Sequence, residues 1–134
     1  RTQNGLHLTL DIPQEALEVR VPRLSLQPLV ENAVNHGLRD KRGEKRIALK
    51  AQCAQDRLFI TVEDNGVGMD EATIASALTY DPDSILVSRS IGLRNINARV
   101  KLLFGEKYGL SIESRVGEGC RVTLCIPKRG NEHA

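Results

Sequence analysis

Hydrophobic residues alternate with polar ones in several short stretches of this chain, beginning close to its start. The alternation covers residues 6–12 and recurs over residues 17–21, after a break at Pro13. A period of two is typical of strands that bury one face. We therefore predict two short antiparallel strands over these two ranges.

Apolar residues at helical spacing mark three later segments. They predict one long helix over residues 24–38 and another over residues 91–104, which Gly105 ends. A shorter helix over residues 70–79 begins at Asp70, a residue type that suits the start of a helix.

Alternation returns in four further stretches, which predict two hairpins. The strands cover residues 47–51, 58–62, 110–114 and 120–126. A turn through Gln55 and Asp56 joins the first pair. Residues 80–90 are polar and irregular, so we expect a lid at about residues 70–91, and residues 128–134 are expected to form a tail.

These elements together predict an α+β fold. Strands and amphipathic helices in this order favour a two-layer sandwich, in which a mixed, mostly antiparallel sheet packs on helices. A length of 134 residues fits a single domain over residues 1–134.

Composition narrows the range of functions. Lys and Arg number 19 against 17 acidic residues, aromatic residues make up 3%, and Trp is absent, which argues against a nucleic-acid partner. No apolar run approaches the roughly 18 residues of a membrane-spanning helix, so we expect no direct membrane contact by this domain.

The chain lacks an initiator Met and a signal peptide, so we interpret it as a fragment of a longer protein. Cys53, Cys120 and Cys125 lack the spacing of a metal or disulfide site and are expected to pack in the core of a protein from a reducing compartment.

Asp64 is the first candidate for binding chemistry. It ends a predicted strand and is followed by Asn65, Gly66 and, after Val67, Gly68. A carboxylate fixed there can accept a hydrogen bond from an exocyclic amine while glycine backbone packs on a flat ring, which would select adenine over guanine. An ordinary Asn-Gly turn explains this segment equally well on its own. The spacing fits neither an EF-hand loop nor a dinucleotide-binding fingerprint, which needs a third glycine.

Polar residues on the first long helix provide a second candidate. Asn32, Asn35 and His36 share one flank, where an amide oxygen can bind Mg²⁺ and its neighbours can face phosphates. A solvated helix face is the alternative for the trio alone. Its coincidence with Asp64 and the glycines favours a binding site.

The start of the second long helix provides a third candidate. Residues 90–93 lead into this helix, where backbone N–H groups and the positive end of the helix dipole suit a phosphate, assisted by Arg89 or Arg94. The alternative is a plain glycine at a helix start with arginines on the surface, and it is favoured for Arg94.

Residues 26–37, 62–69 and 90–95, in this order, resemble the N, G1 and G2 boxes of the catalytic ATP-binding domain of sensor histidine kinases, in the LytS/YehU-like branch. That domain has the GHKL or Bergerat fold, which gyrase B and MutL share. The resemblance covers nearly the whole chain and implies ATP and Mg²⁺ as cofactors. It implies these nucleotide-binding residues: Asn32, Asn35, His36, Asp64, Gly66, Gly68, Met69, Arg89, Gly92, Leu93 and Cys120.

By this resemblance, Asn32 would bind Mg²⁺ through ATP, Asp64 would read adenine, and Arg89 would help the amides of the lid to hold the γ-phosphate. The chain departs from the family pattern in three places, because Ser90 replaces a usual Gly, Cys120 a usual Thr and Asn35 a common Lys. We therefore expect weaker nucleotide binding than in a typical member.

Related ATP hydrolases carry a Glu four residues before the Mg²⁺ asparagine, where this chain has Pro28. This favours phosphoryl transfer to a histidine over hydrolysis. His7, His36 and His133 all lack the context of a dimerisation helix, so we expect the acceptor on an upstream dimerisation domain of a homodimeric parent protein. We assign no catalytic residue within this chain.

The predicted function is therefore that of the catalytic domain of a two-component sensor kinase, whose phosphate passes to a response regulator. The resemblance also implies a cytoplasmic domain of a bacterial inner-membrane sensor. A MutL- or gyrase-like clamp ATPase and a non-catalytic nucleotide sensor remain as alternatives.

Overall fold

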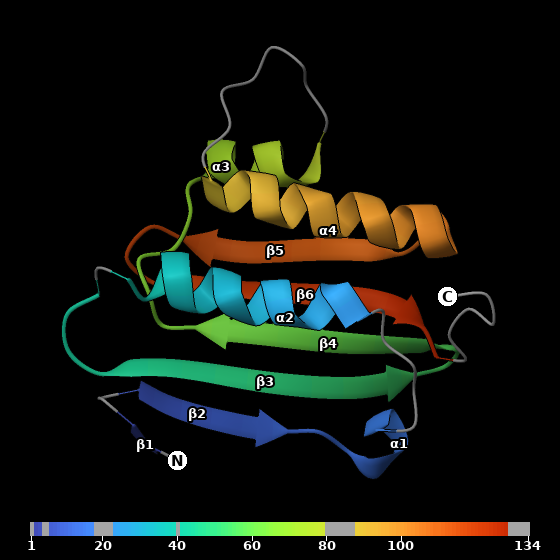
Figure 1. Ribbon diagram of the computed structural model, residues 1–134, viewed down its shortest axis with the longest axis horizontal. Helices are drawn as coiled ribbons and strands as arrows, with labels where there is room; N and C mark the ends of the chain where they lie inside the picture. Colours follow the sequence, from blue (N-terminus) through green and yellow to red (C-terminus); the bar gives the residue numbers. More distant parts are fainter. Residues whose placement is uncertain (1, 4–5, 18–22, 40, 80–87, 129–134) are drawn as a thin grey trace.

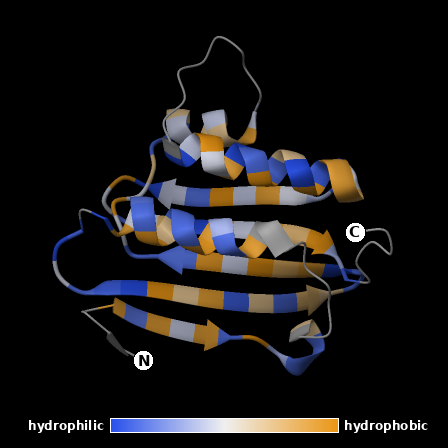
Figure 2. Ribbon diagram, in the orientation of Figure 1, coloured by the Kyte–Doolittle hydropathy of each residue, from blue (hydrophilic) through white to orange (hydrophobic). Residues whose placement is uncertain are grey.

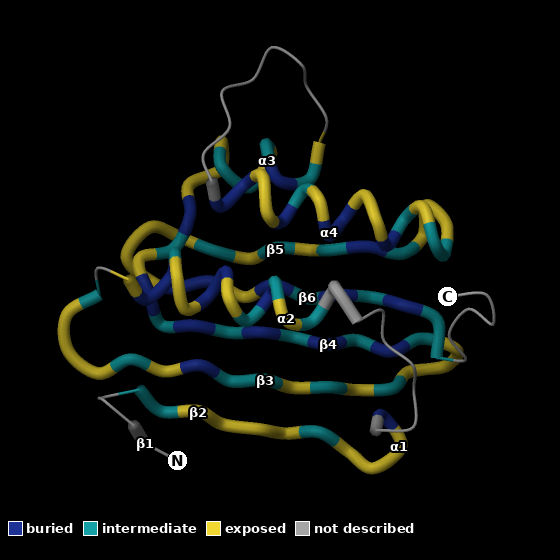
Figure 3. The backbone as a smooth tube through the Cα atoms, viewed as in Figure 1, coloured by how far each residue is buried: buried dark blue, intermediate teal, exposed yellow. Residues whose placement is uncertain are grey.

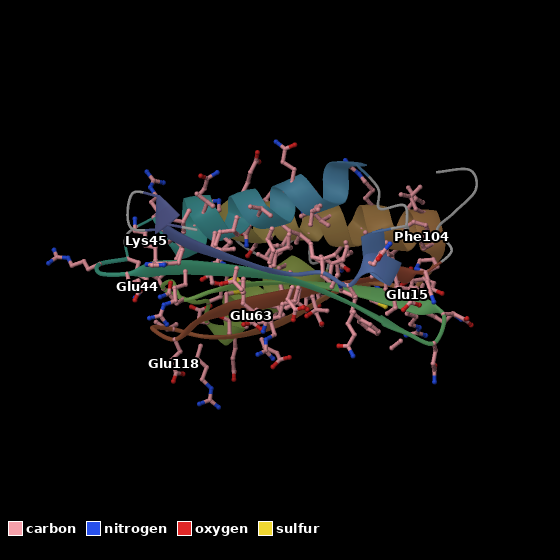
Figure 4. All side chains as sticks on the ribbon, turned by 90° about the horizontal axis from the view of Figure 1, so that it is seen from below. Glu15, Glu44, Lys45, Glu63, Phe104 and Glu118 are labelled. Atoms are coloured by element: carbon pink, nitrogen blue, oxygen red, sulfur yellow. The ribbon has the colours of Figure 1, made fainter. Side chains whose placement is uncertain are left out.

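A computed structural model describes residues 2–3, 6–17, 23–39, 41–79 and 88–128 of the chain. It has two layers, a six-stranded sheet and a helical layer in which α2 and α4 cover one face of the sheet (Figure 1). Seen edge-on, both of these helices lie on the same side of the strands (Figure 4). The predicted α+β two-layer sandwich is confirmed.

The elements follow the chain in this order: β1 (Thr2–Gln3), β2 (Leu6–Asp11), α1 (Gln14–Leu17), α2 (Arg23–Asn32), the π-helical turn η1 (Ala33–Gly37), β3 (Lys45–Ala54), β4 (Arg57–Asp64), α3 (Glu71–Leu78), α4 (Ser88–Phe104), β5 (Gly109–Arg115) and β6 (Gly119–Pro127). The strand order in the sheet is β1-β2-β3-β4-β6-β5. Among the strands that the structure describes, β2 and β3 are parallel and the other neighbours are antiparallel. The sheet is mixed and mostly antiparallel, as predicted.

The alternating pattern of β4 determines where Asp64 points. Leu58, Ile60 and Val62 are buried under the helices, while the residues between them are only partly buried (Figure 3). Asp64 continues the buried row because successive side chains of a strand point to opposite faces. Its carboxyl group therefore enters the interior at the end of a hydrophobic row, next to Ile47 on β3 and Cys120 on β6.

The core lies between the central strands and the two long helices. Its most deeply buried side chains include Leu29 of α2, Leu93 and Val100 of α4, and Leu124 and Ile126 of β6. Apolar residues recur at alternate positions along the strands, as the pattern predicts (Figure 2). Burial of this apolar surface stabilises the arrangement by roughly 25 cal/mol for each Å² removed from water.

The first long helix changes geometry near its end. Residues 24–38 were predicted as one helix, and the structure has an α-helix with Pro28 inside it, followed by the π-helical turn of η1. The N–H of Leu38 donates to the carbonyl of Ala33 at 2.9 Å and closes this wider turn. Single π turns within helices are frequent at functional sites. Here the turn leads directly to Gly37, which contacts the candidate site.

The prediction of a strand over residues 17–21 is wrong at residue 17, because Leu17 ends the short helix α1. Residues 18–22 lie outside the described part of the chain. The N–H of Ala16 donates to the carbonyl of Pro13 at 3.0 Å, and Ala16 is buried against the core, so tertiary packing favours a helical turn. The partners of β2 are accordingly β1 and β3.

The second long helix starts earlier than predicted. It begins at Ser88, so Arg89 and Ser90 are helical rather than irregular. The rest of the predicted irregular stretch, residues 80–87, lies outside the described residues, as does the tail beyond residue 128. The predicted helix over residues 70–79 is confirmed by α3, where the carboxylate of Asp70 accepts a hydrogen bond from the N–H of Thr73 at 2.8 Å.

No described helix is both long enough and apolar enough to cross a membrane.

Candidate functional site

Asp64 lies at the centre of the candidate site. Its side chain is 2% exposed, and its Oδ1 accepts a hydrogen bond of 2.9 Å from the N–H of Gly66. Its Oδ2 lies 3.4 Å from Nη2 of Arg89, which comes from the first turn of α4. Burial raises the pKa of the Asp64 carboxyl group, and the Gly66 N–H and the Arg89 charge only partly oppose this effect.

Two glycines form a close wall around this carboxylate. A Cβ atom at Gly37 would lie 2.7 Å from the carboxyl atoms of Asp64, and one at Gly66 would lie 1.7 Å from the carbonyl oxygen of Gly37. The N–H of Val67 also donates to that carbonyl at 2.8 Å. The end of η1 and the segment after β4 are therefore in direct contact, which joins the predicted N and G1 boxes. The sequence reasoning did not select Gly37, although a glycine directly after His36 was the available signal.

The segment after Gly66 is attached to the hairpin of β5 and β6. A Cβ atom at Gly68, whose φ is +74°, would lie 2.0 Å from the carbonyl oxygen of Arg115. The hydroxyl of Ser114 accepts a hydrogen bond from the N–H of Met69 at 2.8 Å and donates one to the carbonyl of Gly119 at 2.6 Å. Met69 is itself buried. Ser114 was also missed, because no local pattern distinguishes it from other strand serines.

Asn32 supplies an unpaired oxygen at the end of α2. The residue is 7% exposed, and its Oδ1 has no hydrogen-bond partner among the described residues. A buried acceptor without a partner costs about 1–3 kcal/mol, so such an atom points to a missing ligand. Amide oxygens are suitable ligands for Mg²⁺ when a nucleotide supplies the others. Asn32 therefore fits the metal-binding role that the resemblance implies.

Asn35 and His36 differ in their surroundings. Asn35 is exposed, whereas His36 is partly buried. Burial, together with the charges of Arg89 and Arg39, lowers the pKa of His36 and favours its neutral form. His36, Gly68, Met69 and Arg89 line a depression of about 450 Å³.

Cys120 lies beside Asp64 on the neighbouring strand β6. It is opposite Asp64 in the β4–β6 ladder and is buried, and burial raises the pKa of its thiol. Asp64 and Cys120 line a second depression, of about 580 Å³, with residues of β5 and α3. Asp64, which lines this depression, contacts Arg89, which lines the other one.

The residues of the predicted G2 box have distinct positions on α4. Leu93 is completely buried in the core. A Cβ atom at Gly92 would meet open space among the described residues. Ser90 is completely buried, and its hydroxyl donates to the carbonyl of Thr73 on α3 at 3.0 Å. Asp64, Gly66, Gly68, Met69, His36, Arg89 and Cys120 thus form one connected region, while Asn35 and Gly92 lie at exposed positions.

The sequence and the fold of this chain match known proteins. The chain belongs to the family of histidine kinase-, DNA gyrase B-, and HSP90-like ATPases, whose model matches residues 19–130. The predicted resemblance to histidine kinases of the LytS/YehU-like branch is confirmed by its relatives.

Three curated relatives are all sensor proteins. The chain is 40% identical over 129 residues to the sensor histidine kinase YesM of Bacillus subtilis, 31% identical over 129 residues to the sensor histidine kinase BtsS of Escherichia coli, and 32% identical over 136 residues to the sensor protein LytS of Bacillus anthracis. These matches cover 96%, 96% and 98% of this chain. The chain spans only 21–22% of the length of these relatives.

Solved structures of histidine kinases share the fold. The nucleotide-free catalytic domain of histidine kinase ThkA superposes with a TM-score of 0.69 at 16% identity, covering 92% of this chain and 81% of that one. The histidine kinase domain of the blue-light activated kinase of Erythrobacter litoralis EL346 gives a TM-score of 0.63 at 19% identity, covering 93% of this chain and 52% of that one. The GHKL fold is thereby established for this chain.

Proposed function

We propose that this domain binds Mg-ATP and donates the γ-phosphoryl group to a histidine on an upstream dimerisation domain of the same longer protein. The observation that supports this most strongly is the buried carboxylate of Asp64, fixed by the N–H of Gly66 in a chain of this ATPase family. The relatives that match nearly the whole chain are named as sensor histidine kinases.

Asp64 would bind the adenine base. Its Oδ1 is already fixed by the backbone, and Oδ2 is the atom that can accept a hydrogen bond from the exocyclic amine of adenine. Guanine has a carbonyl oxygen at the corresponding ring position, which would face the carboxylate unfavourably. The backbone at Gly37 and Gly66 lies close enough to Asp64 to form a wall without side chains, against which a flat ring can pack.

Asn32 and His36 would serve the phosphate end. The unpaired oxygen of Asn32 fits Mg²⁺, which would reduce the negative charge on the phosphates when it is bound. His36 is held neutral by its surroundings, so it can donate one hydrogen bond to a phosphate oxygen without adding charge. Backbone N–H groups near the start of α4 would add further donors.

The residues around Asn32 favour phosphoryl transfer over hydrolysis. Pro28 occupies the position at which related hydrolases place a glutamate, and it offers no base. Glu31 is the nearest carboxylate in sequence, but it is exposed and accepts a hydrogen bond from Gln27 at 2.9 Å. A neutral histidine on another domain already has an unprotonated nitrogen and needs no such base.

The acceptor and the downstream partner would lie outside this chain. His7 is in β2 and lies 2.8 Å from Glu44, so it belongs to the sheet rather than to a dimerisation helix. We infer a homodimeric parent protein, a response regulator as the final phosphate acceptor, and a location on the cytoplasmic side of a bacterial inner membrane. The relatives named as sensor proteins support this placement.

Calorimetric titration with ATP, with and without Mg²⁺, tests the binding step. We expect Asp64→Ala to weaken ATP binding by about 10–100-fold, since the adenine amine would be left buried without an acceptor. Asn32→Ala should remove most of the Mg²⁺ dependence. Unchanged ATP affinity in Asp64→Ala would contradict the proposed site.

A phosphotransfer assay tests the reaction itself. The domain is produced with its upstream helices and incubated with labelled ATP, and we expect label on a histidine of those helices. Release of phosphate without labelled protein would instead indicate a clamp ATPase, and ATP binding without either activity would indicate a nucleotide sensor.

A further inference from the structure

The contact between Arg89 and Asp64 has an unusual geometry for a buried ion pair. The two side chains are 6% and 2% exposed, and their closest atoms, Nη2 and Oδ2, are 3.4 Å apart. Charge-assisted hydrogen bonds of this type normally measure about 2.7–2.9 Å and are often bidentate. The Nε atom of Arg89 is also buried and has no partner among the described residues. Both charges are therefore removed from water while only one long contact forms between them.

Such a pair contributes little to the stability of the fold. The removal of two charges from water is offset only when the geometry is close and the remaining donors are satisfied. Neither condition holds here, because the contact is long and Nε is unpaired. A ligand that offers Asp64 a shorter hydrogen bond, and lets Arg89 find other partners, would replace this contact.

We propose that Arg89 is an internal competitor of the adenine base: its guanidinium N–H takes the position at Oδ2 of Asp64 that the exocyclic amine would take, and nucleotide enters by displacing it. This inference rests on the proposed function of Asp64. A guanidinium group is planar and presents N–H donors at its edge, as the amine edge of adenine does. Oδ2 can accept more than one hydrogen bond, so the competition is for the space beside this oxygen, which the guanidinium and the base would both occupy.

The structure also provides a place for the displaced side chain. Arg89 lines the depression of about 450 Å³ that His36 and Gly68 also line, on the side where we place the phosphates. A guanidinium that leaves Asp64 can turn towards this space and meet phosphate oxygens bidentately. One arginine then opposes the base in the empty domain and assists the phosphates in the occupied one.

Displacement would be transmitted to the contact between α3 and α4. Arg89 directly precedes Ser90, which is fully buried and bonded to the carbonyl of Thr73 on α3. A change in the first turn of α4 therefore acts on a residue that contacts both helices. Binding of the base would be linked in this way to the packing of α4 against α3.

Adenosine and ATP together distinguish the two contacts of Arg89, because adenosine has no phosphates. We would measure both dissociation constants at pH 8 for wild type, Arg89→Met and Arg99→Met. Methionine is unbranched and uncharged, and Arg99 is an exposed arginine farther along α4, which makes Arg99→Met a matched control. We expect Arg89→Met to bind adenosine about tenfold more tightly than wild type, with a smaller gain or a loss for ATP, and Arg99→Met to match wild type.

A folded Arg89→Met variant that binds adenosine as wild type does, or more weakly, would overturn the competition. If Arg89→Met does not fold, the NMR signal of the Arg89 side chain is followed in the wild type instead. This signal is assigned as the one that is lost in Arg89→Lys. That signal should move when adenosine is added, and an unmoved signal at saturation would also overturn the proposal. If wild type binds neither ligand, or if Asp64→Ala binds ATP as wild type does, the proposed function of the site fails instead.

Discussion

Gly37 gives the most direct test of how the fold positions the Asp64 carboxylate. Replacing it with alanine adds one methyl group, which would lie 2.7 Å from each of the three carboxyl atoms of Asp64. Ordinary van der Waals contact begins at 3.4 Å, so one of the two groups must move by about 0.7 Å. We expect the carboxylate of Asp64 to move, because the backbone carbonyl of Gly37 is held by the N–H of Val67.

Gly37→Ala is expected to weaken both folding and binding, by similar free energies. Overpacking by one methyl group costs about 1–3 kcal/mol of stability. A shift of roughly 1 Å in a positioned group can reduce its function by as much as 100-fold, so we expect ATP affinity to fall by about 10–100-fold. Adenosine binding should fall by a similar factor, because the damage lies at the base end of the site.

Calorimetric titration with ATP and adenosine, together with thermal unfolding, measures both effects. Gly43→Ala is the control, since Gly43 lies in the loop before β3 and, unlike Gly37, has open space for a methyl group. Its φ of +85° makes the change mildly destabilising. We expect Gly43→Ala to lower the melting temperature slightly and to leave ATP affinity unchanged. A folded Gly37→Ala variant with wild-type affinity for both ligands would refute the reasoning.

Three further outcomes follow from the structure. Leu93→Ala should destabilise the domain by about 2–5 kcal/mol in denaturant unfolding, whereas Leu102→Ala, at a position that is 88% exposed, should change it by less than about 0.5 kcal/mol. Because the folded state lowers the pKa of His36 from 6.5, the wild type should lose stability relative to His36→Gln as the pH falls through 6.5, and a constant difference would contradict this. Ser90→Gly should remove the bond to Thr73 and lower stability by about 1 kcal/mol while it tightens ATP binding, and unchanged affinity in both Ser90→Gly and Cys120→Thr would contradict the expectation of weakened binding.

The sequence predicted those parts of the site that depend on one element at a time. Alternation in β4 places Asp64 on the buried face whatever its neighbours are. Helical spacing put Asn32 on a polar flank with Asn35 and His36, whereas the structure buries Asn32 and leaves Asn35 exposed. The π turn and Gly37 depend on packing against a strand far along the chain, as does the bond from Met69 to Ser114. Local patterns carry no information about such contacts, so these positions were found only in the structure.

The errors in the predicted elements have the same origin. Alternation over residues 17–21 suits a strand, but Leu17 is helical because the turn after Pro13 buries Ala16 against the core. The parallel pairing of β2 with β3 joins segments separated by α2, which alternation alone cannot specify. The second long helix was predicted to start at residue 91. The structure starts α4 at Ser88, and Arg89 in its first turn contacts Asp64, a pairing of distant segments that local spacing cannot indicate.

The position of Arg89 also explains why the neighbouring serine matters. Glycine in place of Ser90 would leave the first turn of α4 without its bond to α3, and the turn would be freer to adjust around a ligand. With serine, the same turn is held to Thr73 and keeps the guanidinium of Arg89 near Asp64. Under the proposed competition, the Ser90–Thr73 bond and the Arg89–Asp64 contact act in one direction, since the first holds the turn that places Arg89 beside Asp64. Nucleotide binding must then work against both contacts, so their effects on affinity are expected to be coupled rather than additive.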